Sequence, residues 1–302
     1  MKLKILSLAK QEKGTMDMPE QFSENIRPDL IKRAVLAAMA NKRQPYGVNS
    51  YAGKKSVSKL SKRRQHYRGM YGKGISRTPR KIMSRSGTQM RWVGAFAPQT
   101  VGGRRSHPPK AEKIWKQKIN RKERRKAIRS ALSATVAKEI VRQRGHLLPE
   151  SYPFIIDSKI ESTKKTKELI ETFNKLGFEN ELERTGRKII RAGRGKIRGR
   201  KYKKVRGMLL VVSENCDAAK SAKNIPGLEV AEVRKLNAEI LAPGTFPGRM
   251  AIFTEKAVEI IANERLFTDN QVKKEIRKEE AKKVGEKTEK PKKEIKKTAK
   301  NK

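Results

Sequence analysis

The chain has few cysteines, few aromatic residues and no long apolar run. Its 302 residues include a single cysteine, Cys216, which excludes an internal disulfide framework and a Cys-based zinc finger. No stretch is apolar enough to span a bilayer, so we expect no membrane segment. Residues 1–8 are only weakly signal-like, because charged residues follow a short apolar stretch, and we interpret them as a strand. We therefore expect a cytoplasmic protein.

Acidic residues are also scarce. The chain has 31 Asp and Glu against 75 Lys and Arg, which gives a formal net charge of +44. Such an excess requires counter-charge from a partner, and phosphates are the usual source because binding them releases condensed counterions. The alternative is a very soluble protein with solvated basic faces, but solubility is served by much smaller net charges. The composition therefore favours nucleic acid as the partner.

The hydrophobic pattern predicts a globular part and several basic segments. Hydrophobic content of 35% and aromatic content of 5% are low, so part of the chain packs a core and part does not. In residues 1–45 and 110–267 strands alternate with helices, which predicts one discontinuous α/β domain with a mostly parallel sheet and flanking helices. The predicted strands are 2–8, 154–157, 208–212, 228–233 and 250–253. The predicted helices are 29–40, 120–144, 162–176 (capped by Gly177) and 255–263.

Residues 46–109 form a long basic loop inserted in that domain. From Ile31 to Lys110 there is no Asp or Glu, against 20 Lys and Arg. The loop has no sustained period, and a loop of this length without its own elements is uncommon in a compact domain. One interpretation is a disordered linker; we favour a segment ordered by its partner. Aromatic side chains interleaved with Arg suit base stacking beside phosphate pairing, and here they are Tyr46, Tyr51, Tyr67, Tyr71, Trp92 and Phe96.

Two further segments are basic. Gly186–Gly207 contains no acidic residue and eleven Lys and Arg, and we predict a surface loop on RNA. Thr268–Lys302 is a Lys/Glu-rich C-terminal tail with 14 Lys and Arg against 7 Asp and Glu. The tail lacks apolar periodicity, so we expect it to be disordered alone.

Little in the sequence supports catalysis. Residues 193–199 superficially resemble a glycine-rich nucleotide loop, but the glycine spacing is wrong and no Ser or Thr follows Gly195-Lys196. Cys216 has no designated histidine partner. We predict no catalytic residue, no metal, no cofactor and no small-molecule substrate. Surface or RNA-contacting roles are expected for the histidines, which flank no carboxylate cluster: His66, His107 and His146.

Trp115 allows two interpretations. It lies in a basic segment, residues 112–117, which we predict to be helical. Contact with RNA and packing on the core are both compatible with an indole in that position, and we favour the core.

Several segments resemble a known family, the fourth protein of the ribosomal large subunit in its archaeal and eukaryotic form. The most specific is Val233-Arg-Lys-Leu-Asn-Ala-Glu-Ile-Leu-Ala-Pro-Gly244, followed by Gly248-Arg-Met-Ala-Ile-Phe-Thr-Glu-Lys256. The similarity spans residues 3–266, and without the long C-terminal extension of eukaryotic members the chain is most like an archaeal one. The other segments are Ala95–Pro98, Arg104–Lys110, Arg129–Thr135 and Leu209–Glu214.

The resemblance implies a structural role in the large subunit, without enzymatic activity. Its expected partners are large-subunit rRNA, neighbouring large-subunit proteins and the nascent peptide, since the family's long loop penetrates rRNA and helps line the exit tunnel. The loop tip would fall at Tyr71, Gly72, Lys73, Gly74, Ile75 and Arg77. The residues that we predict to bind rRNA are Lys54, Lys55, Lys62, Arg63, Arg64, Tyr67, Arg68, Lys73, Arg77, Arg80, Lys81, Arg85, Arg91, Trp92, Arg104, Arg105, Arg187, Arg191, Arg194, Lys196, Arg198, Arg200, Lys201 and Lys203.

Two alternatives share the same composition. An rRNA-binding assembly factor would bind subunit precursors and be absent from mature subunits. A basic chromosomal protein would bind DNA instead of RNA. The sequence alone does not separate them from a ribosomal constituent, because all three neutralise phosphates with Lys and Arg.

Overall fold

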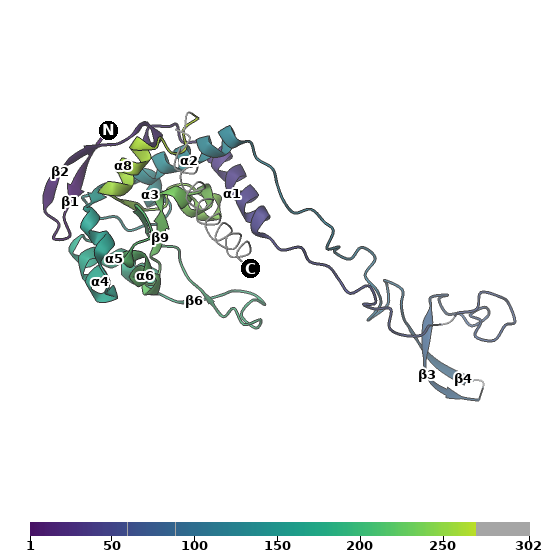
Figure 1. Cartoon of the computed structure of the whole chain (residues 1–302). Helices are drawn as coiled ribbons and strands as arrows, with labels where there is room; N and C mark the ends of the chain where they lie inside the picture. The colour runs from purple at the N-terminus through teal and green to yellow at the C-terminus, as the bar shows by residue number, and fades with distance from the viewer. Residues whose placement is uncertain (59, 88, 270–302) are drawn as a thin grey trace, which may run out of the picture. The chain divides into compact units, whose positions relative to one another are not determined.

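The computed structural model describes residues 1–58, 60–87 and 89–269 (Figure 1). The chain divides into two compact units, and we describe each by itself. The globular unit comprises Met1–Met39 and the described residues from Lys118 onward, and the inserted unit comprises Ala40–Gln117. The boundaries predicted at 1–45, 46–109 and 110–267 stay predictions. The predicted tail lies outside the described residues, except for Thr268 and Asp269.

A six-stranded sheet forms the centre of the globular unit, in the order β2-β1-β5-β10-β8-β9. Strands β1 and β2 pair antiparallel, and every other neighbouring pair is parallel. The mostly parallel α/β sheet predicted from the alternation of strands and helices is therefore confirmed. The sequence analysis missed β2, whose side chains are nearly all exposed. The strands are β1 Lys2–Leu6, β2 Glu12–Asp17, β5 Ile155–Ile156, β8 Leu209–Val212, β9 Glu229–Glu232 and β10 Ala251–Thr254.

Helices cover both faces of this sheet. Along the strands other than β2, alternate side chains enter two separate apolar clusters, because successive residues of a strand point to opposite faces. Leu209 and Val211 join the cluster of α1, α2, α7 and α8, whereas Leu210 and Val212 join that of α3 and α4. The helices are α1 Pro28–Lys42, α2 Arg121–Val136, α3 Lys138–Gln143, α4 Thr166–Lys175, α5 Glu179–Gly186, α6 Asp217–Ser221, α7 Ala238–Leu241 and α8 Glu255–Asn263.

The helix predicted over 120–144 is wrong in one respect: it is two helices. Ala137, between α2 and α3, has an extended backbone with φ −72° and ψ 101°. The hydroxyl of Tyr152 donates a hydrogen bond to the carbonyl of Thr135. That carbonyl is therefore satisfied from outside the helix, and the chain can turn there without leaving it unpaired.

The helix predicted over 162–176 begins later, at Thr166, after a 3-10 turn over Ser158–Ser162. Within that turn Glu161 accepts hydrogen bonds from the Ser213 backbone N–H at 2.9 Å and the Thr254 hydroxyl at 2.6 Å. These groups follow β8 and end β10, so the turn is fixed to the ends of two strands. The predicted cap is confirmed: Gly177 has a φ of +91° and donates to the Asn174 carbonyl, as an αL cap does.

The inserted unit has its own secondary structure, contrary to the prediction of a loop without elements. Strand β3 Arg80–Ser86 pairs antiparallel with β4 Gln89–Gly94 (Figure 1). The register shifts between Ile82 and Ser84. We missed the hairpin because none of its side chains is fully buried and only those of β4 alternate between exposed and half-buried, so the alternating hydrophobic pattern of a strand is weak. No helix forms over 112–117.

The second basic segment is also a hairpin instead of an irregular loop. β6 Ile189–Ile190 pairs antiparallel with β7 Tyr202–Lys203, and all four residues are exposed. The turn that joins them contains the glycine-rich residues 193–199, and no helix follows it. The segment therefore lacks the strand-to-helix turn of a nucleotide-binding loop.

Among residues 1–58, 60–87 and 89–269, no helix has both the length and the apolarity needed to cross a membrane.

Candidate RNA interface

In the inserted unit, cations gather around two exposed tyrosine rings. The guanidinium of Arg68 lies 5.1 Å from the ring centre of Tyr67, and that of Arg85 lies 5.8 Å from it. The structure thus brings together predicted residues from an irregular segment and from β3. Such cation–ring contacts contribute about 0.5–1 kcal/mol each at exposed sites.

Tyr71 is the second ring of this kind. Arg77 lies 4.8 Å and Arg64 lies 5.9 Å from its centre, and Arg77 also donates a 2.8 Å hydrogen bond to the Tyr71 hydroxyl. Residues 71–74 form a turn, and Tyr71 to Arg77 are exposed throughout. They carry the predicted loop tip, whose place near the exit tunnel stays a prediction.

The β3–β4 hairpin presents a third group of predicted residues. The Lys73 ammonium lies 5.3 Å from the Trp92 ring centre. A cavity of about 660 Å³ opens beside it, with Arg85 and Arg91 among its lining residues. A half-buried indole beside three cations offers both a stacking surface and phosphate ligands, which is what single-stranded nucleic acid requires.

No carboxylate lies within residues 31–110, so cations of this stretch cannot form ion pairs inside it. They use ring faces and backbone carbonyls instead: Arg80 donates to the Ser76 carbonyl at 3.1 Å, and Arg85 to that of Gly87 at 2.9 Å. Within the described residues, the buried Nε atoms of Arg68 and Arg80 have no hydrogen-bond partner. Donors without acceptors are rare in buried positions, so the protein by itself leaves these two groups unsatisfied.

The remaining predicted residues of the inserted unit are spread along it. Arg104 and Lys81 are half-buried. The structure brings neither of them to the tyrosine rings described above. Exposed positions in turns or irregular segments are held by Lys54, Lys55, Lys62, Arg63 and Arg105.

Trp115 belongs to the inserted unit and not to the core, so the favoured interpretation was wrong. It lies in neither apolar cluster. Its ring stacks on Tyr46 with 5.7 Å between centres, and the Arg43 guanidinium lies 3.6 Å from the Trp115 ring. We missed this stack because Tyr46 and Trp115 are far apart in sequence and no periodicity links them.

The β6–β7 hairpin displays the second predicted set on the globular unit. Arg191 holds the hairpin together: its backbone N–H donates to the Lys201 carbonyl at 2.8 Å and its Nε to the Arg200 carbonyl at 3.1 Å. Two-stranded hairpins are marginally stable alone, so a partner on this surface would stabilise it. The exposed cations of the set are Arg187, Arg194, Lys196, Arg198, Arg200, Lys201 and Lys203.

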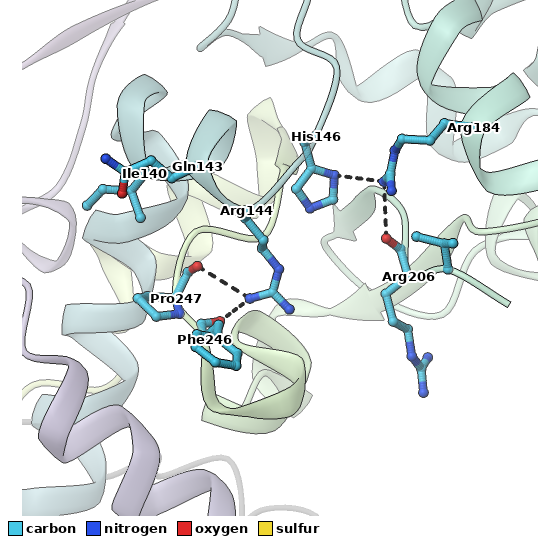
Figure 2. Close-up of a pocket in the computed structure, with 9 residues that line it drawn as sticks. Ile140, Gln143, Arg144, His146, Arg184, Arg206, Phe246 and Pro247 are labelled. Carbon is cyan, nitrogen blue, oxygen red and sulfur yellow. Dashed lines mark hydrogen bonds between the residues drawn. The ribbon is translucent and has the colours of Figure 1, made fainter. Parts of the chain in front are cut away.

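One charged cluster was missed entirely, and it corrects the prediction for His146. The residue is buried, and its Nδ1 lies 2.7 Å from the carboxylate of the fully buried Glu181. Arg184 donates to both oxygens of Glu181, at 2.7 and 2.6 Å. Figure 2 shows its further contact with His146, at 3.3 Å. The partners are separated by 35 residues, so sequence spacing gave no signal of the pair.

Burial changes the acid–base properties of this cluster. Burial lowers the pKa of His146, although hydrogen bonding to Glu181 opposes it. Burial alone would raise the pKa of Glu181, but hydrogen bonds from Arg184 and His146 bring it below its usual value. Beside the cluster, burial lowers the pKa of Arg144 to about 10. His146 and Glu181 are hydrogen-bonded by protein groups on every side that the structure shows, which joins α5 to the segment after α3.

Two further observations bear on chemistry. Among the described residues, no group of three or more His, Cys, Asp or Glu could hold a metal ion. Cys216 is half-buried at the start of α6, and burial raises the pKa of its thiol, so the reactive thiolate is disfavoured.

The segment 233–256, which carries the most specific resemblance, is a packing motif. Arg249 is buried and donates to Glu229 at 2.8 Å and to the carbonyls of Gly207 and Ile240. Gly248 has a φ of +83°, and a Cβ there would lie 2.8 Å from the Ile140 carbonyl oxygen. Only glycine fits such a close approach of two backbones.

Comparisons with known proteins agree with this structure. The model of the ribosomal protein L4/L1 family matches residues 16–264. The large ribosomal subunit protein uL4 of Nanoarchaeum equitans is 46% identical over 268 residues, which cover 88% of this chain and 100% of the relative. The uL4 proteins of Archaeoglobus fulgidus and Methanococcoides burtonii are 43% and 44% identical, covering 86% and 84% of this chain and 98% and 95% of theirs. The chain belongs to the ribosomal protein L4/L1 family, in its archaeal type.

Proposed function

We propose that the chain is a structural, non-enzymatic constituent of the large ribosomal subunit, where it binds and organises large-subunit rRNA beside neighbouring ribosomal proteins. Membership of the L4/L1 family and the relatives named large ribosomal subunit protein uL4 support this function. Its site of action is the cytoplasmic ribosome. The observation that carries the proposal is the composition of residues 31–110, which contain 20 Lys and Arg and no carboxylate.

RNA supplies what the inserted unit lacks. Phosphates neutralise its Lys and Arg, and exposed rings such as those of Tyr67 and Tyr71, 52% and 39% exposed, offer faces for bases. Ordering a long segment costs on the order of 1–2 kcal/mol per residue in backbone entropy. Many phosphate contacts offset that cost, so the binding free energy depends strongly on salt.

A more specific proposal concerns the exposed segment Tyr71–Arg77, which begins with a turn over residues 71–74. We propose that this segment is the loop tip and that it lies beside the nascent peptide in the exit tunnel. Its exposure supports the proposal, as does the small size of Gly72 and Gly74, which leaves room where RNA backbones crowd together. The β3–β4 hairpin would then be held between RNA segments.

Sedimentation of cell extracts tests the function. At low salt the protein is expected in the large-subunit fractions, and above about 1 M salt it is expected to be released, because screening then weakens its phosphate contacts. Recovery of the protein in the free fraction under both conditions would contradict the proposal.

The same gradients separate the two alternatives. An assembly factor would sediment with precursors and be missing from mature subunits. A chromosomal protein would be released by DNase and not by RNase.

A further inference from the structure

A cavity of about 540 Å³ lies in the globular unit, outside the inserted unit. It is lined by side chains from α3, α5, the segment after β7 and the turn before β10. Volumes of 300–1,000 Å³ are typical of pockets for small organic groups. One nucleotide is of that size.

The cavity is cationic. Among the described residues, no carboxylate pairs with Arg144. It donates instead to the carbonyl of Phe246 and, at 3.3 Å, to that of Pro247 (Figure 2), and at 2.5 Å to that of Pro243. Arg184 shares the cavity wall with His146, and within the described part of the chain Glu181, which is fully buried, is the one carboxylate bound to them.

Arg206 adds a third cation. Its side chain is 67% exposed, and its contact with Glu229 at 3.3 Å competes with the closer contact of Arg249 at 2.8 Å. The walls therefore carry more positive charge than the protein itself neutralises.

An exposed aromatic ring stands at the same cavity. Phe246 is 72% exposed although it lines the pocket. Its backbone is held by the hydrogen bonds of Arg144 to the Pro243–Pro247 turn, so the ring is presented by a fixed segment. A fixed aromatic face beside cations is the arrangement on which unpaired bases stack.

The cavity continues the basic hairpin. Val205 and Arg206, which line it, come directly after β7 and the run of cations on β6–β7. An RNA strand that follows the hairpin's cations would therefore reach the pocket without leaving positive surface. An acidic protein segment would match the charge but would bring no planar base to stack on the exposed ring of Phe246.

We propose that this cavity is a nucleotide-binding pocket for one unpaired nucleotide of large-subunit rRNA. The base stacks on Phe246, and the phosphate contacts Arg206 and Arg184. The inference rests on the proposed function, because it deepens the binding of the same RNA. It gives the globular unit an RNA contact of its own, in addition to the contacts predicted for the inserted unit.

Photo-crosslinking in assembled large subunits tests the proposal. The full chain carries Phe246→p-benzoylphenylalanine, with Ile170→p-benzoylphenylalanine, exposed on α4 and not among the pocket residues, as its matched control. The expected result is an RNase-sensitive RNA adduct from position 246 and none from position 170. A crosslink from 246 to protein alone overturns the inference and identifies a protein occupant.

A third probe separates this inference from the function on which it rests. This probe is Tyr67→p-benzoylphenylalanine, at a position in the inserted unit. RNA adducts at 67 without adducts at 246 overturn the pocket and leave the function standing. A protein that is absent from large subunits altogether overturns the function itself.

Binding to in vitro transcribed large-subunit rRNA distinguishes stacking from charge. Phe246→Ala is expected to weaken binding roughly fivefold or more with an unchanged salt slope, because stacking releases no counterion. Arg206→Gln is expected to lower the salt slope by about one. Ile170→Ala and Lys167→Gln, both exposed on α4, are the controls. Equal losses from all four variants contradict the pocket.

Discussion

The two units of the chain satisfy their charges in opposite ways. In the globular unit, two cations meet buried or half-buried carboxylates: the buried Arg249 meets Glu229 at 2.8 Å, and the half-buried Arg184 meets Glu181 at 2.6 Å. In the inserted unit, Arg77 faces the ring of Tyr71. Residues 31–110 contain no carboxylate that could replace it.

The difference shows what each unit requires in order to be stable. A buried cation paired with a carboxylate is neutralised within the fold, and removing either partner is costly. A cation on an aromatic ring keeps its charge available to an external anion. The globular unit therefore neutralises these two cations within its own fold, whereas we expect the cations of the inserted unit to find most of their anions on RNA.

The largest effect is expected from neutralising the inserted unit. Replacing Lys54, Lys55, Lys62, Arg63 and Arg64 with Gln removes about five phosphate contacts. The salt slope of rRNA binding is then expected to fall by about four, which at 0.1 M salt corresponds to roughly 10⁴-fold weaker binding. Filter binding over a range of salt concentrations measures both quantities.

Five exposed lysines of the globular unit provide the matched control: Lys164, Lys167, Lys175, Lys223 and Lys256, each changed to Gln. Equal losses in the two quintuple variants would remove the distinction between the units.

The second largest effect concerns the charges inside the globular unit. Glu181→Ala leaves Arg184 and His146 without their carboxylate in a buried position. The free energy of unfolding is expected to fall by about 3–5 kcal/mol. Chemical denaturation measures it, and Glu183→Ala, exposed on the same helix, is expected to change it by less than about 0.5 kcal/mol.

A smaller effect is expected from pH. Because burial lowers the pKa of His146, the folded state binds fewer protons than the unfolded state near that pKa. Stability is therefore full above the ordinary histidine value of 6.5 and falls as the pH drops below it. The lowered pKa of Glu181 makes stability fall only when the pH drops below its ordinary value of 4.5. Of these two groups, only His146 therefore changes stability between pH 7 and 5.

His146→Asn keeps a donor near the Nδ1 position and cannot gain the proton. Denaturation midpoints of this variant are expected to vary less between pH 7 and 5 than those of the parent chain. His107→Asn, at an exposed position, is the control. An unchanged pH dependence in His146→Asn would show that the buried cluster does not titrate.

The smallest effect is expected from deleting Met70–Arg80 in the inserted unit. Neither apolar cluster of the globular unit contains these residues. The free energy of unfolding of the globular unit is expected to change by less than about 0.5 kcal/mol. Loss of cooperative unfolding in the deletion variant would mean that the two units are not independent.

The fold was predictable wherever hydrophobic pattern decided it. Leu209–Val212 and Ala251–Thr254 are fully buried strands, and the alternation of such strands with helices predicted a mostly parallel sheet. Helix α8 was predicted with its observed bounds, because Val258 and Ile261 repeat at helical spacing. Elements without such a pattern, such as β2 and β3–β4, were missed.

The break between α2 and α3 and the contact of His146 with Glu181 were not predictable, because residues distant in sequence cause them. The helix over 120–144 breaks where Tyr152 takes the Thr135 carbonyl. Likewise, His146 was assigned to the surface, and only the fold brings Glu181 beneath it.

Of the candidate interface, the sequence predicted a set of cations but not the contacts that they make in the structure. The absence of carboxylates from 31–110 was enough to predict an RNA-binding segment, and that assignment stays a prediction. It did not indicate that Arg68 and Arg85 meet on Tyr67, or that Trp115 stacks on Tyr46. Those contacts depend on how the chain turns between the residues, and no periodicity in the sequence specifies those turns.

Residue-resolved mapping of RNA crosslinks in assembled large subunits tests the central contrast most directly. After ultraviolet irradiation and nuclease digestion, mass spectrometry locates each nucleotide adduct on the chain. The expected result is adducts distributed along 46–109 and 187–206, with α4 and α8 free of them. Adducts absent from 46–109, in subunits that contain the protein, would contradict the account.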